Sequence, residues 1–205
     1  MKLIMSRHAE TITNTQRKFA GWTDSPLTAA GIKAANELAE YLKNVAIDVA
    51  VCSTTQRARK TCEIALKYQQ VEVLYYDEFR ELNFGDWEGV SLSSLEDDPL
   101  TYYFFNEPDK FTAPNGENLL ELLQRSLGKV NDLFRDYPDK TVFLMSHGLT
   151  IRNLNNYFYG NPISMLRAKT KFLHSCSISV IDYRSPRDFA VVLEGDTSFL
   201  SAEVG

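Results

Sequence analysis

The chain has 205 residues, of which 44% are hydrophobic and 24% charged, and its formal net charge is −5. This length suits one domain with a sizeable buried core, and the composition is typical of a globular protein. The acidic balance argues against nucleic acid or an anionic membrane surface as the main partner. No CxxC spacing links Cys52, Cys62 and Cys176, so we interpret them as free thiols in a reducing compartment.

The N-terminus does not have the pattern of a signal peptide, because only three apolar residues separate Lys2 from Ser6. No apolar run approaches the length that a membrane span requires. We therefore expect a cytoplasmic protein that binds neither a membrane nor nucleic acid.

The first half of the chain alternates predicted strands and helices. A strand-like run over residues 2–5 ends at Ser6-Arg7-His8, and Thr28 is a candidate N-cap for a helix whose apolar residues continue to Leu42. Residues 47–51 are rich in β-branched side chains and predict a second strand. A helix over residues 55–68 and a strand over residues 71–75 complete this half.

The second half begins with a loop-like stretch over residues 77–89, then a helix candidate over 92–105 and irregular, proline-containing chain over 106–115. Gly116-Glu117-Asn118 opens a long helix that Pro138 closes. The remaining predicted elements are a strand over residues 141–145, a helix over 150–159, and strands over 177–183 and 189–194.

This alternation favours one α/β domain over residues 1–205, with three α/β/α layers around a mostly parallel central sheet. Residues 90–115 are predicted to form a small cap of helix and loop inserted into it. Ligands of such sheets bind beyond the carboxyl ends of the strands. Three polar turns follow predicted strands, and we expect them to converge on one crevice: Ser6-Arg7-His8, Ser53 to Arg57, and Ser146-His147-Gly148.

The residues of these turns are suited to phosphoryl transfer. A phosphoenzyme mechanism needs an unprotonated nucleophile, cations on the non-bridging oxygens and an acid for the leaving oxygen. His8 is the candidate nucleophile, because a neutral imidazole attacks phosphorus without prior activation by a base. Arg7 and Arg57 are candidate clamps, each with a planar fork that matches phosphate oxygens.

Three more residues are candidates for binding the phosphoryl group. His147, if cationic or donating, would stabilise charge on the transferring group, and Asn14 would add a neutral donor. The Gly148 amide would contribute a further donor at the start of a helix.

The proton donor is expected in the segment over residues 80–89. A carboxyl close to a dianionic phosphate and to aromatic residues can have its pKa raised enough to donate a proton. We select Glu81 over Asp86 and Glu88, although periodicity does not separate the three, and we expect a structural role for Glu88 in its turn.

Six sequence blocks occur in a fixed order along nearly the whole chain. They are Arg7-His8-Ala9-Glu10-Thr11 with Asn14, Thr23-Asp24-Ser25-Pro26-Leu27-Thr28 with Gly31, Ser53 with Arg57-Ala58 and Thr61, Glu81 with Gly85-Asp86-Trp87-Glu88-Gly89, Asn115-Gly116-Glu117, and Ser146-His147-Gly148. With these blocks the chain resembles the histidine phosphatase superfamily, which contains cofactor-dependent phosphoglycerate mutases and acid phosphatases.

The resemblance implies His8 as the phosphorylated residue and Glu81 as the proton donor. It also implies that Arg7, Arg57 and His147 form the phosphate pocket, and that hydrolysis requires neither a metal nor an organic cofactor.

Two positions depart from the usual pattern of this family. Ala9 stands where most members have glycine after the nucleophile, which is tolerable unless the turn requires a positive φ. His174 stands where many relatives have asparagine near the pocket. We interpret it either as a change in the hydrogen bonding or pH response of the pocket, or as a polar surface substitution.

The charges of the segment over residues 89–124 distinguish hydrolysis from isomerisation. A phosphoglycerate mutase must hold a substrate carboxylate and a second phosphate, which needs several cations near the mouth. Lys110 is the single cationic residue of this segment. The segment carries seven carboxylates, which are Glu96, Asp97, Asp98, Glu107, Asp109, Glu117 and Glu121. Its aromatic residues include Tyr102, Tyr103, Phe104, Phe105 and Phe111. Hydrolysis of a small phosphorylated metabolite is therefore preferred, with phosphoglycerate mutase as the alternative.

Three further interpretations stay open. Phe84-Gly85-Asp86-Trp87-Glu88 and Asn115-Gly116-Glu117 are similar to α-ribazole phosphatases, whose substrate carries an aromatic base that the aromatic cap could stack against. The aromatic run over residues 102–105 is equally consistent with a core or a homodimer contact. The chain is alternatively a catalytically idle relative that binds a phospho-ligand or a protein.

A metal site made of His8, His147 and Glu81 is disfavoured by the two nearby arginines.

Overall fold

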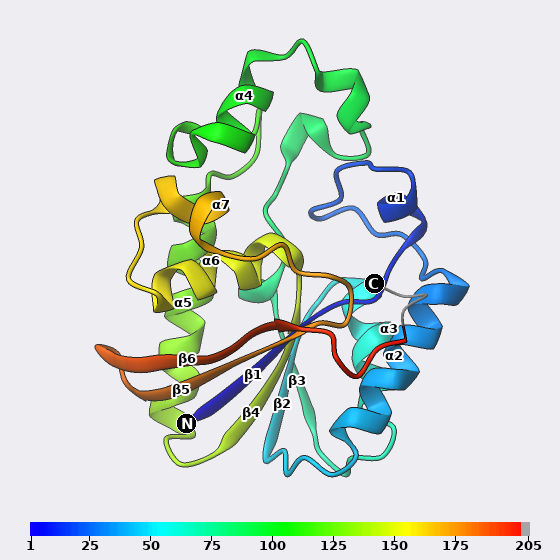
Figure 1. The fold of residues 1–205 in the computed structure, drawn as a ribbon, viewed down its shortest axis with the longest axis vertical. Coiled ribbons are helices and arrows are strands. Elements are labelled where there is room, and N and C mark those ends of the chain that lie inside the picture. Colours follow the sequence, from blue (N-terminus) through cyan, green and yellow to red (C-terminus); the bar gives the residue numbers. More distant parts are fainter. Residues whose placement is uncertain (202–205) are drawn as a thin grey trace.

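A single six-stranded sheet forms the centre of the computed structural model, which describes residues 1–201 (Figure 1). The strand order is β3-β2-β4-β1-β5-β6. The strands are β1 (Lys2–Arg7), β2 (Val49–Ser53), β3 (Val73–Tyr76), β4 (Thr141–Ser146), β5 (Ile178–Ser185) and β6 (Asp188–Asp196). The first four strands in chain order pair in parallel, whereas β5 runs antiparallel to β1 and β6 antiparallel to β5. The predicted mostly parallel sheet is thus confirmed.

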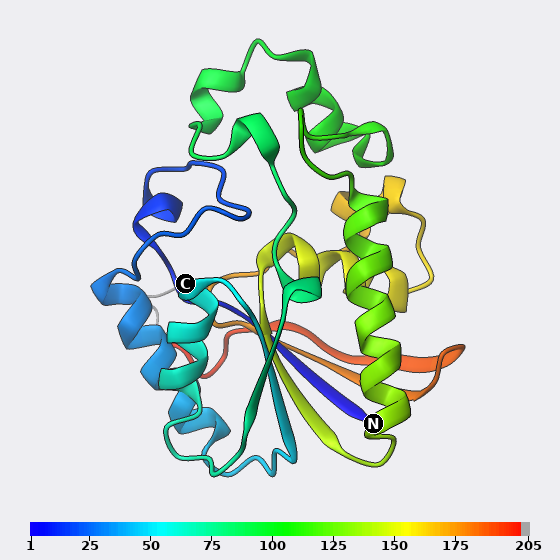
Figure 2. The same ribbon diagram turned by 180° about the vertical axis from the view of Figure 1, so that it is seen from behind.

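Helices cover both faces of this sheet (Figure 1, Figure 2). Helices α2 (Ala29–Leu42) and α3 (Gln56–Ala65) pack on one face, and α5 (Leu119–Asp136) and α6 (Gly148–Phe158) pack on the other. Successive side chains of a strand point to opposite faces, so Ile4 joins the first core while Leu3 and Met5 join the second. Because both faces are buried, the central strands are apolar throughout rather than alternating with polar residues.

Side-chain caps fix the starts of two of these helices. The Thr28 hydroxyl accepts a hydrogen bond from the Gly31 amide at the start of α2, as the sequence predicts. At the start of α5, Asn118 and Glu121 form a reciprocal capping box. Helix α5 ends at Asp136, two residues before Pro138.

The chain between the sheet and α5 forms a cap above the carboxyl ends of the strands (Figure 1). The continuous helix predicted over residues 92–105 is wrong: a 3-10 turn (Leu92–Leu95) is followed by a separate helix, α4 (Pro99–Asn106). Pro99 disfavours a helical conformation at Asp98, and the Asp98 side chain instead caps α4 by accepting from the Leu100 amide. Other short elements that the sequence did not predict are α1 (Ile12–Thr15), α7 (Leu166–Lys169) and the 3-10 turns Asp77–Phe79, Gly85–Trp87, Pro108–Lys110 and Ile163–Met165.

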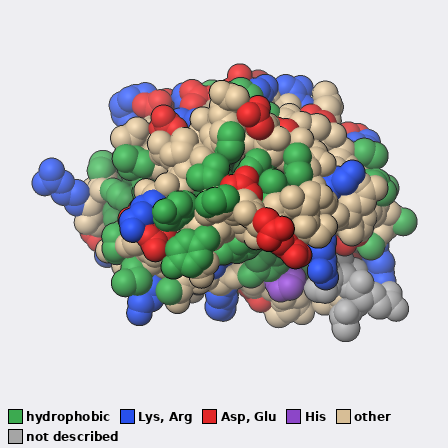
Figure 3. Space-filling model, turned by 90° about the horizontal axis from the view of Figure 1, so that it is seen from above, with side chains coloured by type: hydrophobic (Ala, Val, Ile, Leu, Met, Phe, Trp, Pro, Cys, Tyr) green, Lys and Arg blue, Asp and Glu red, His purple; other side chains and the backbone are tan. Residues whose placement is uncertain are grey.

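The aromatic run of the cap divides between its interior and its surface. Phe104 is buried in a separate apolar cluster with Trp87 and Phe111, whereas Tyr102 and Phe105 are exposed. Seen from above, hydrophobic side chains gather on the cap side of the molecule (Figure 3). The run is therefore neither wholly core nor wholly surface.

Within residues 1–201, the structure contains no helix that is both long and apolar enough to cross a bilayer.

Candidate active site

Three of the predicted site residues meet at the carboxyl ends of β1, β2 and β4. His8 follows β1, Arg57 lies in the first turn of α3 after β2, and His147 is the N-cap of α6 after β4. The Arg57 guanidinium lies between the two imidazoles, with Nε 3.2 Å from His8 Nε2 and Nη2 3.2 Å from His147 Nδ1. The centroids of the two imidazole rings are 5.1 Å apart. The expected convergence of the three polar turns is therefore found.

The hydrogen bonds of His8 define which of its nitrogens is available. Nδ1 lies 2.8 Å from the carbonyl oxygen of Ala9, which can only accept, so a neutral His8 carries its proton on Nδ1. Nε2 then carries the lone pair, which accepts a hydrogen bond from Arg57 Nε at 3.2 Å. Burial, followed by the positive charges of Arg57 and Arg7, holds the pKa of His8 well below its usual value. The ring is thus the unprotonated imidazole that attack on phosphorus requires.

His147 is also held neutral, but in the opposite tautomer. Its Nδ1 accepts from Arg57, so its Nε2 carries the proton and donates to the Ser53 hydroxyl at 2.7 Å. Burial and the charge of Arg57 keep the pKa of His147 well below its usual value. In this arrangement His147 accepts a hydrogen bond on the side of Arg57, and its predicted donation to a phosphoryl group stays a prediction.

These two neutral imidazoles make the free energy of unfolding dependent on pH. Below about pH 6.5 the unfolded chain protonates both histidines while the folded protein does not, so unfolding takes up protons and stability falls on acidification. We expect the slope to rise on acidification toward about 1.4 kcal/mol per pH unit for each histidine, measured by urea denaturation between about pH 5 and 7. His8→Gln should reduce this slope by up to about 1.4 kcal/mol per pH unit, and a slope unchanged from that of the wild-type protein would contradict the assignment.

Arg57 is held by backbone carbonyls rather than left free. Nη1 donates to Thr23 O at 2.8 Å, and Nη2 donates to Ala20 O at 3.1 Å and Gly21 O at 2.6 Å. Asp24 adds an ion pair of 3.3 Å to Nη1. The loop over residues 20–24 therefore fixes the direction of the guanidinium.

Glu88 holds that loop in place. Its carboxylate accepts from the amides of Gly21, Trp22, Thr23 and Phe84 at 2.9 to 3.1 Å. A Cβ on Gly21 would lie 1.9 Å from the carbonyl oxygen of Leu82, so the close approach of the two segments requires glycine. The structural role predicted for Glu88 agrees with these contacts.

Glu81 lies at the start of α6. Its carboxylate accepts from the amides of Leu149 at 2.9 Å and Thr150 at 3.0 Å, and from the Thr150 hydroxyl at 3.0 Å. These bonds use two of the free amides at a helix N-terminus, where a negative charge is favoured. The Gly148 amide donates no hydrogen bond that the structure describes within residues 1–201, so it is the amide of this turn that remains for a ligand.

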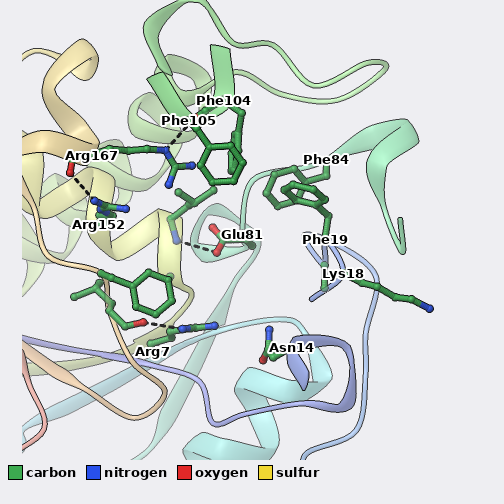
Figure 4. Close-up of a pocket in the computed structure, with 15 residues that line it drawn as sticks. Arg7, Asn14, Lys18, Phe19, Glu81, Phe84, Phe104, Phe105, Arg152 and Arg167 are labelled. Carbon is green, nitrogen blue, oxygen red and sulfur yellow. Dashed lines mark hydrogen bonds between the residues drawn. The ribbon is translucent and has the colours of Figure 1, made fainter. Parts of the chain in front are cut away.

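A cavity of about 250 Å³ lies beneath the cap (Figure 4). Four predicted residues line it: Arg7, Asn14, Glu81 and Gly148. His8, Arg57 and His147 do not line the cavity and are almost fully buried, with at most 4% of each residue exposed. The predicted site is thus divided into a buried trio and a cavity wall, with Arg7 next to His8 in the chain.

Arg7 and Asn14 each present unused donors in this wall. Nη1 of Arg7 donates to Leu173 O at 2.7 Å, while its Nε is buried without an acceptor. The Oδ1 atom of Asn14 accepts from the amide and hydroxyl of Thr11, which leaves the Nδ2 hydrogens without a partner among the described residues. Both side chains are therefore fixed at one end and free at the other, as anion-binding groups need to be.

Sequence reasoning missed two arginines that line the same cavity, Arg152 of α6 and Arg167 of α7. None of the seven carboxylates of residues 89–124, all within the described part of the chain, lines it. The shortage of cations in residues 89–124 therefore does not extend to this cavity, because its cations come from segments distant in sequence. The position of Arg152 could have been predicted from the sequence, because it follows Gly148 by four residues and so lies on the same face of the helix. No comparable pattern indicates that Arg167 lines the cavity.

Arg125 of α5 is a positioning residue whose role the sequence did not indicate. Its guanidinium donates to the carbonyl oxygens of Glu78, Arg80 and Glu81, each at 2.8 Å. It also forms a two-bond ion pair with Glu117, at 2.8 and 2.9 Å. Arg125 thereby positions the segment that carries Glu81.

The two departures from the family pattern lie differently in this geometry. Ala9 is not among the residues with a positive φ, so its Cβ is accommodated without strain. His174 is exposed and does not line this cavity, but it lines a neighbouring pocket together with Arg7 and Asn14; its ring packs edge-on against Phe172, with centroids 5.4 Å apart. Within residues 1–201 no group of three or more His, Cys, Asp or Glu side chains is arranged to hold a metal ion.

Comparison with known proteins shows the family of the chain. The family model of the histidine phosphatase superfamily (branch 1) matches residues 3–197. The chain belongs to this superfamily. The uncharacterized phosphatase PhoE of Bacillus subtilis is 35% identical over 170 residues, which cover 83% of this chain and 82% of PhoE. The probable phosphoglycerate mutase GpmB of Escherichia fergusonii is 31% identical over 208 residues, 98% of this chain and 96% of GpmB.

Two solved structures share the fold of this chain. YhfR of Bacillus stearothermophilus superposes with a TM-score of 0.92 at 29% identity, over 98% of this chain and 99% of YhfR. A putative alpha-ribazole-5'-P phosphatase of Escherichia coli superposes with a TM-score of 0.85 at 26% identity, over 96% of each chain. Relatives of this chain therefore carry both phosphatase and mutase names.

Proposed function

We propose that this histidine phosphatase superfamily member hydrolyses a small phosphomonoester through transient phosphorylation of His8. The observation that carries the proposal is the neutral, buried imidazole whose Nε2 lone pair lies beside the Arg57 guanidinium. That arrangement supplies an unprotonated nucleophile and a cation at the same point. The three free, buried cysteines support a cytoplasmic location for this chemistry.

Hydrolysis then proceeds in two displacements. In the first, His8 Nε2 forms a bond to phosphorus, the bond from phosphorus to the alcohol oxygen breaks, and Glu81, whose protonated form the bound dianion favours, gives that oxygen a proton. In the second, Glu81 takes a proton from water, the water oxygen attacks phosphorus, and the bond to Nε2 breaks to release phosphate. Arg7, Arg57 and Asn14 bind the non-bridging oxygens, and a nearby dianion favours a protonated His147 that donates to them.

The names of the relatives favour hydrolysis but leave isomerisation as a second candidate. PhoE and the putative alpha-ribazole-5'-P phosphatase are named as phosphatases, which supports a phosphatase and makes α-ribazole phosphate a substrate to test. The presence of Arg152 and Arg167 in the cavity favours the mutase alternative, because a mutase needs cations for a second anionic group.

One set of assays separates these candidates. We expect release of phosphate from phenyl phosphate in the presence of EDTA, and an acid-labile, base-stable phosphoenzyme after rapid quenching. Isomerisation of 3-phosphoglycerate primed by a bisphosphate, faster than its hydrolysis, would establish the mutase instead. Failure to turn over phenyl phosphate, α-ribazole phosphate or the phosphoglycerates, with vanadate still bound, would show an idle binding relative.

A further inference from the structure

One wall of the cavity carries two arginines that no carboxylate neutralises (Figure 4). Nε of Arg152 donates to the Thr170 hydroxyl at 2.7 Å, and its Nη2 donates to the carbonyl oxygens of Arg167 and Thr170 at 3.1 and 2.9 Å. No ion pair within residues 1–201 includes Arg7, Arg152 or Arg167. Glu194 acts on Arg152 from beyond ion-pair distance.

Arg167 is fixed by the aromatic residues of α4. Its Nε donates to Phe104 O at 2.8 Å, and the guanidinium lies 4.3 Å from the ring centroid of Phe104 and 4.8 Å from that of Phe105. Burial and the charge of Arg152 lower the pKa of Arg167 to about 10, so it stays cationic at neutral pH. A rigid, charged fork of this kind is pre-organised for a planar anion.

The hydrogen bonds of this pair are incomplete. Arg167 Nη2 is buried without an acceptor, and Nη1 of Arg152 and of Arg167 donates to no described residue. A buried donor without a partner costs free energy that an incoming acceptor recovers. Two like charges held together in a chain of net charge −5 indicate an anion as the missing partner.

The second anion belongs to the molecule that carries the phosphoryl group, because the phosphate-binding candidates Arg7, Asn14 and Gly148 line the same cavity of about 250 Å³ as the two arginines. Figure 4 shows Arg152 and Arg167 on one wall, Phe19 and Phe84 on the facing wall, and Glu81 between them. This volume lies below the common range for ligand sites. A carboxylate fits it better than a second phosphate, because it is smaller and planar like the guanidinium.

We propose that Arg152 and Arg167 bind a carboxylate of the substrate, and that the preferred substrates are phosphomonoesters with an apolar or aromatic body bearing that carboxylate. The inference rests on the proposed phosphatase activity and specifies its substrate class. Phe104 and Phe105 would line the apolar body while Arg7 and the His8 site hold the phosphoryl group.

The test compares phenyl phosphate with its 2-, 3- and 4-carboxyphenyl analogues, because these differ only in the carboxylate and its position. For at least one carboxyphenyl phosphate, we expect kcat/KM of the wild-type protein to be at least tenfold higher than for phenyl phosphate. A factor of this size corresponds to the contribution of one hydrogen bond between charged groups. Turnover of phenyl phosphate with no preference among the four would overturn this inference and leave the phosphatase proposal intact. Absence of turnover of all four would overturn both.

Variants then assign the preference to the arginines. Arg167→Gln should reduce the ratio of the two kcat/KM values about tenfold, and Arg167→Lys, which keeps the charge without the fork, should reduce it less. The same Gln change at Arg187, an exposed arginine outside the cavity, should leave the ratio unchanged. The melting temperature of Arg167→Gln shows whether this variant is folded. An unaltered ratio in the folded variant would contradict the assignment of the preference to Arg167. If the variant does not fold, the comparison of substrates with the wild-type protein still tests the proposal.

Discussion

Replacing His8 by alanine should lower kcat/KM for phenyl phosphate by at least about 10⁴-fold, because the covalent route has no second nucleophile of the same kind. The other buried imidazole, His147, is fully buried, whereas His8 keeps 4% of its surface exposed and directly follows Arg7 of the cavity wall in the chain. It is therefore not placed to substitute for His8. The measurement is steady-state turnover together with rapid-quench trapping of the phosphoenzyme.

Two controls make this result specific to the nucleophile. Arg187→Ala changes an exposed side chain outside the cavity and should retain turnover within about threefold, as surface substitutions usually do. Inhibition by vanadate should persist in His8→Ala, since Arg7, Asn14 and the Gly148 amide remain. Phosphoenzyme in the His8→Ala protein at the wild-type level would contradict the proposed mechanism.

The sheet and its helices were predictable because each depends on local pattern. Apolar runs of strand length, such as residues 141–145, are buried on both faces in the structure, and Thr28 caps α2 as its position indicates. A single helix over residues 92–105 was mispredicted because Pro99, the stronger local signal, was given too little weight.

The ligating turns of the site were predictable for a related reason. Parallel strands end at one edge, so His8, Arg57 and His147 had to lie near one another once their strands were recognised. Their hydrogen-bond states were not predictable, because these depend on the Ala9 carbonyl and on the Ser53 hydroxyl.

Residues that act through tertiary contact gave almost no sequence signal. Arg167 reaches the cavity only because α7 packs below α4, and its partner atom there is the backbone carbonyl of Phe104, which no side-chain pattern encodes. The acidic composition of the cap was misleading for the same reason, since composition does not say which side chains face inward.

The Arg57 side chain connects His8 and His147 to the loop over residues 20–24. Arg57→Gln should lower the free energy of unfolding by about 3–5 kcal/mol, because it leaves the Ala20, Gly21 and Thr23 carbonyl oxygens without their cationic donor. It should also lower kcat by about 10² to 10³-fold, the usual cost of removing one pre-organised donor from a site of developing charge. Urea denaturation and phenyl phosphate turnover measure the two effects.

The matched control is Arg59→Gln, two residues along the same helix. Arg59 donates to Thr54 O at 3.0 Å and lies 4.3 Å from the ring centroid of Tyr75, without contact to either imidazole. Its loss should cost about 1 kcal/mol or less and leave turnover within about threefold. If Arg57→Gln behaved like Arg59→Gln in both assays, the loop and not the guanidinium would be what holds His8 and His147 in place. A drop in turnover without a drop in stability would instead assign Arg57 to phosphate binding alone, since its carbonyl contacts would then add nothing to the fold.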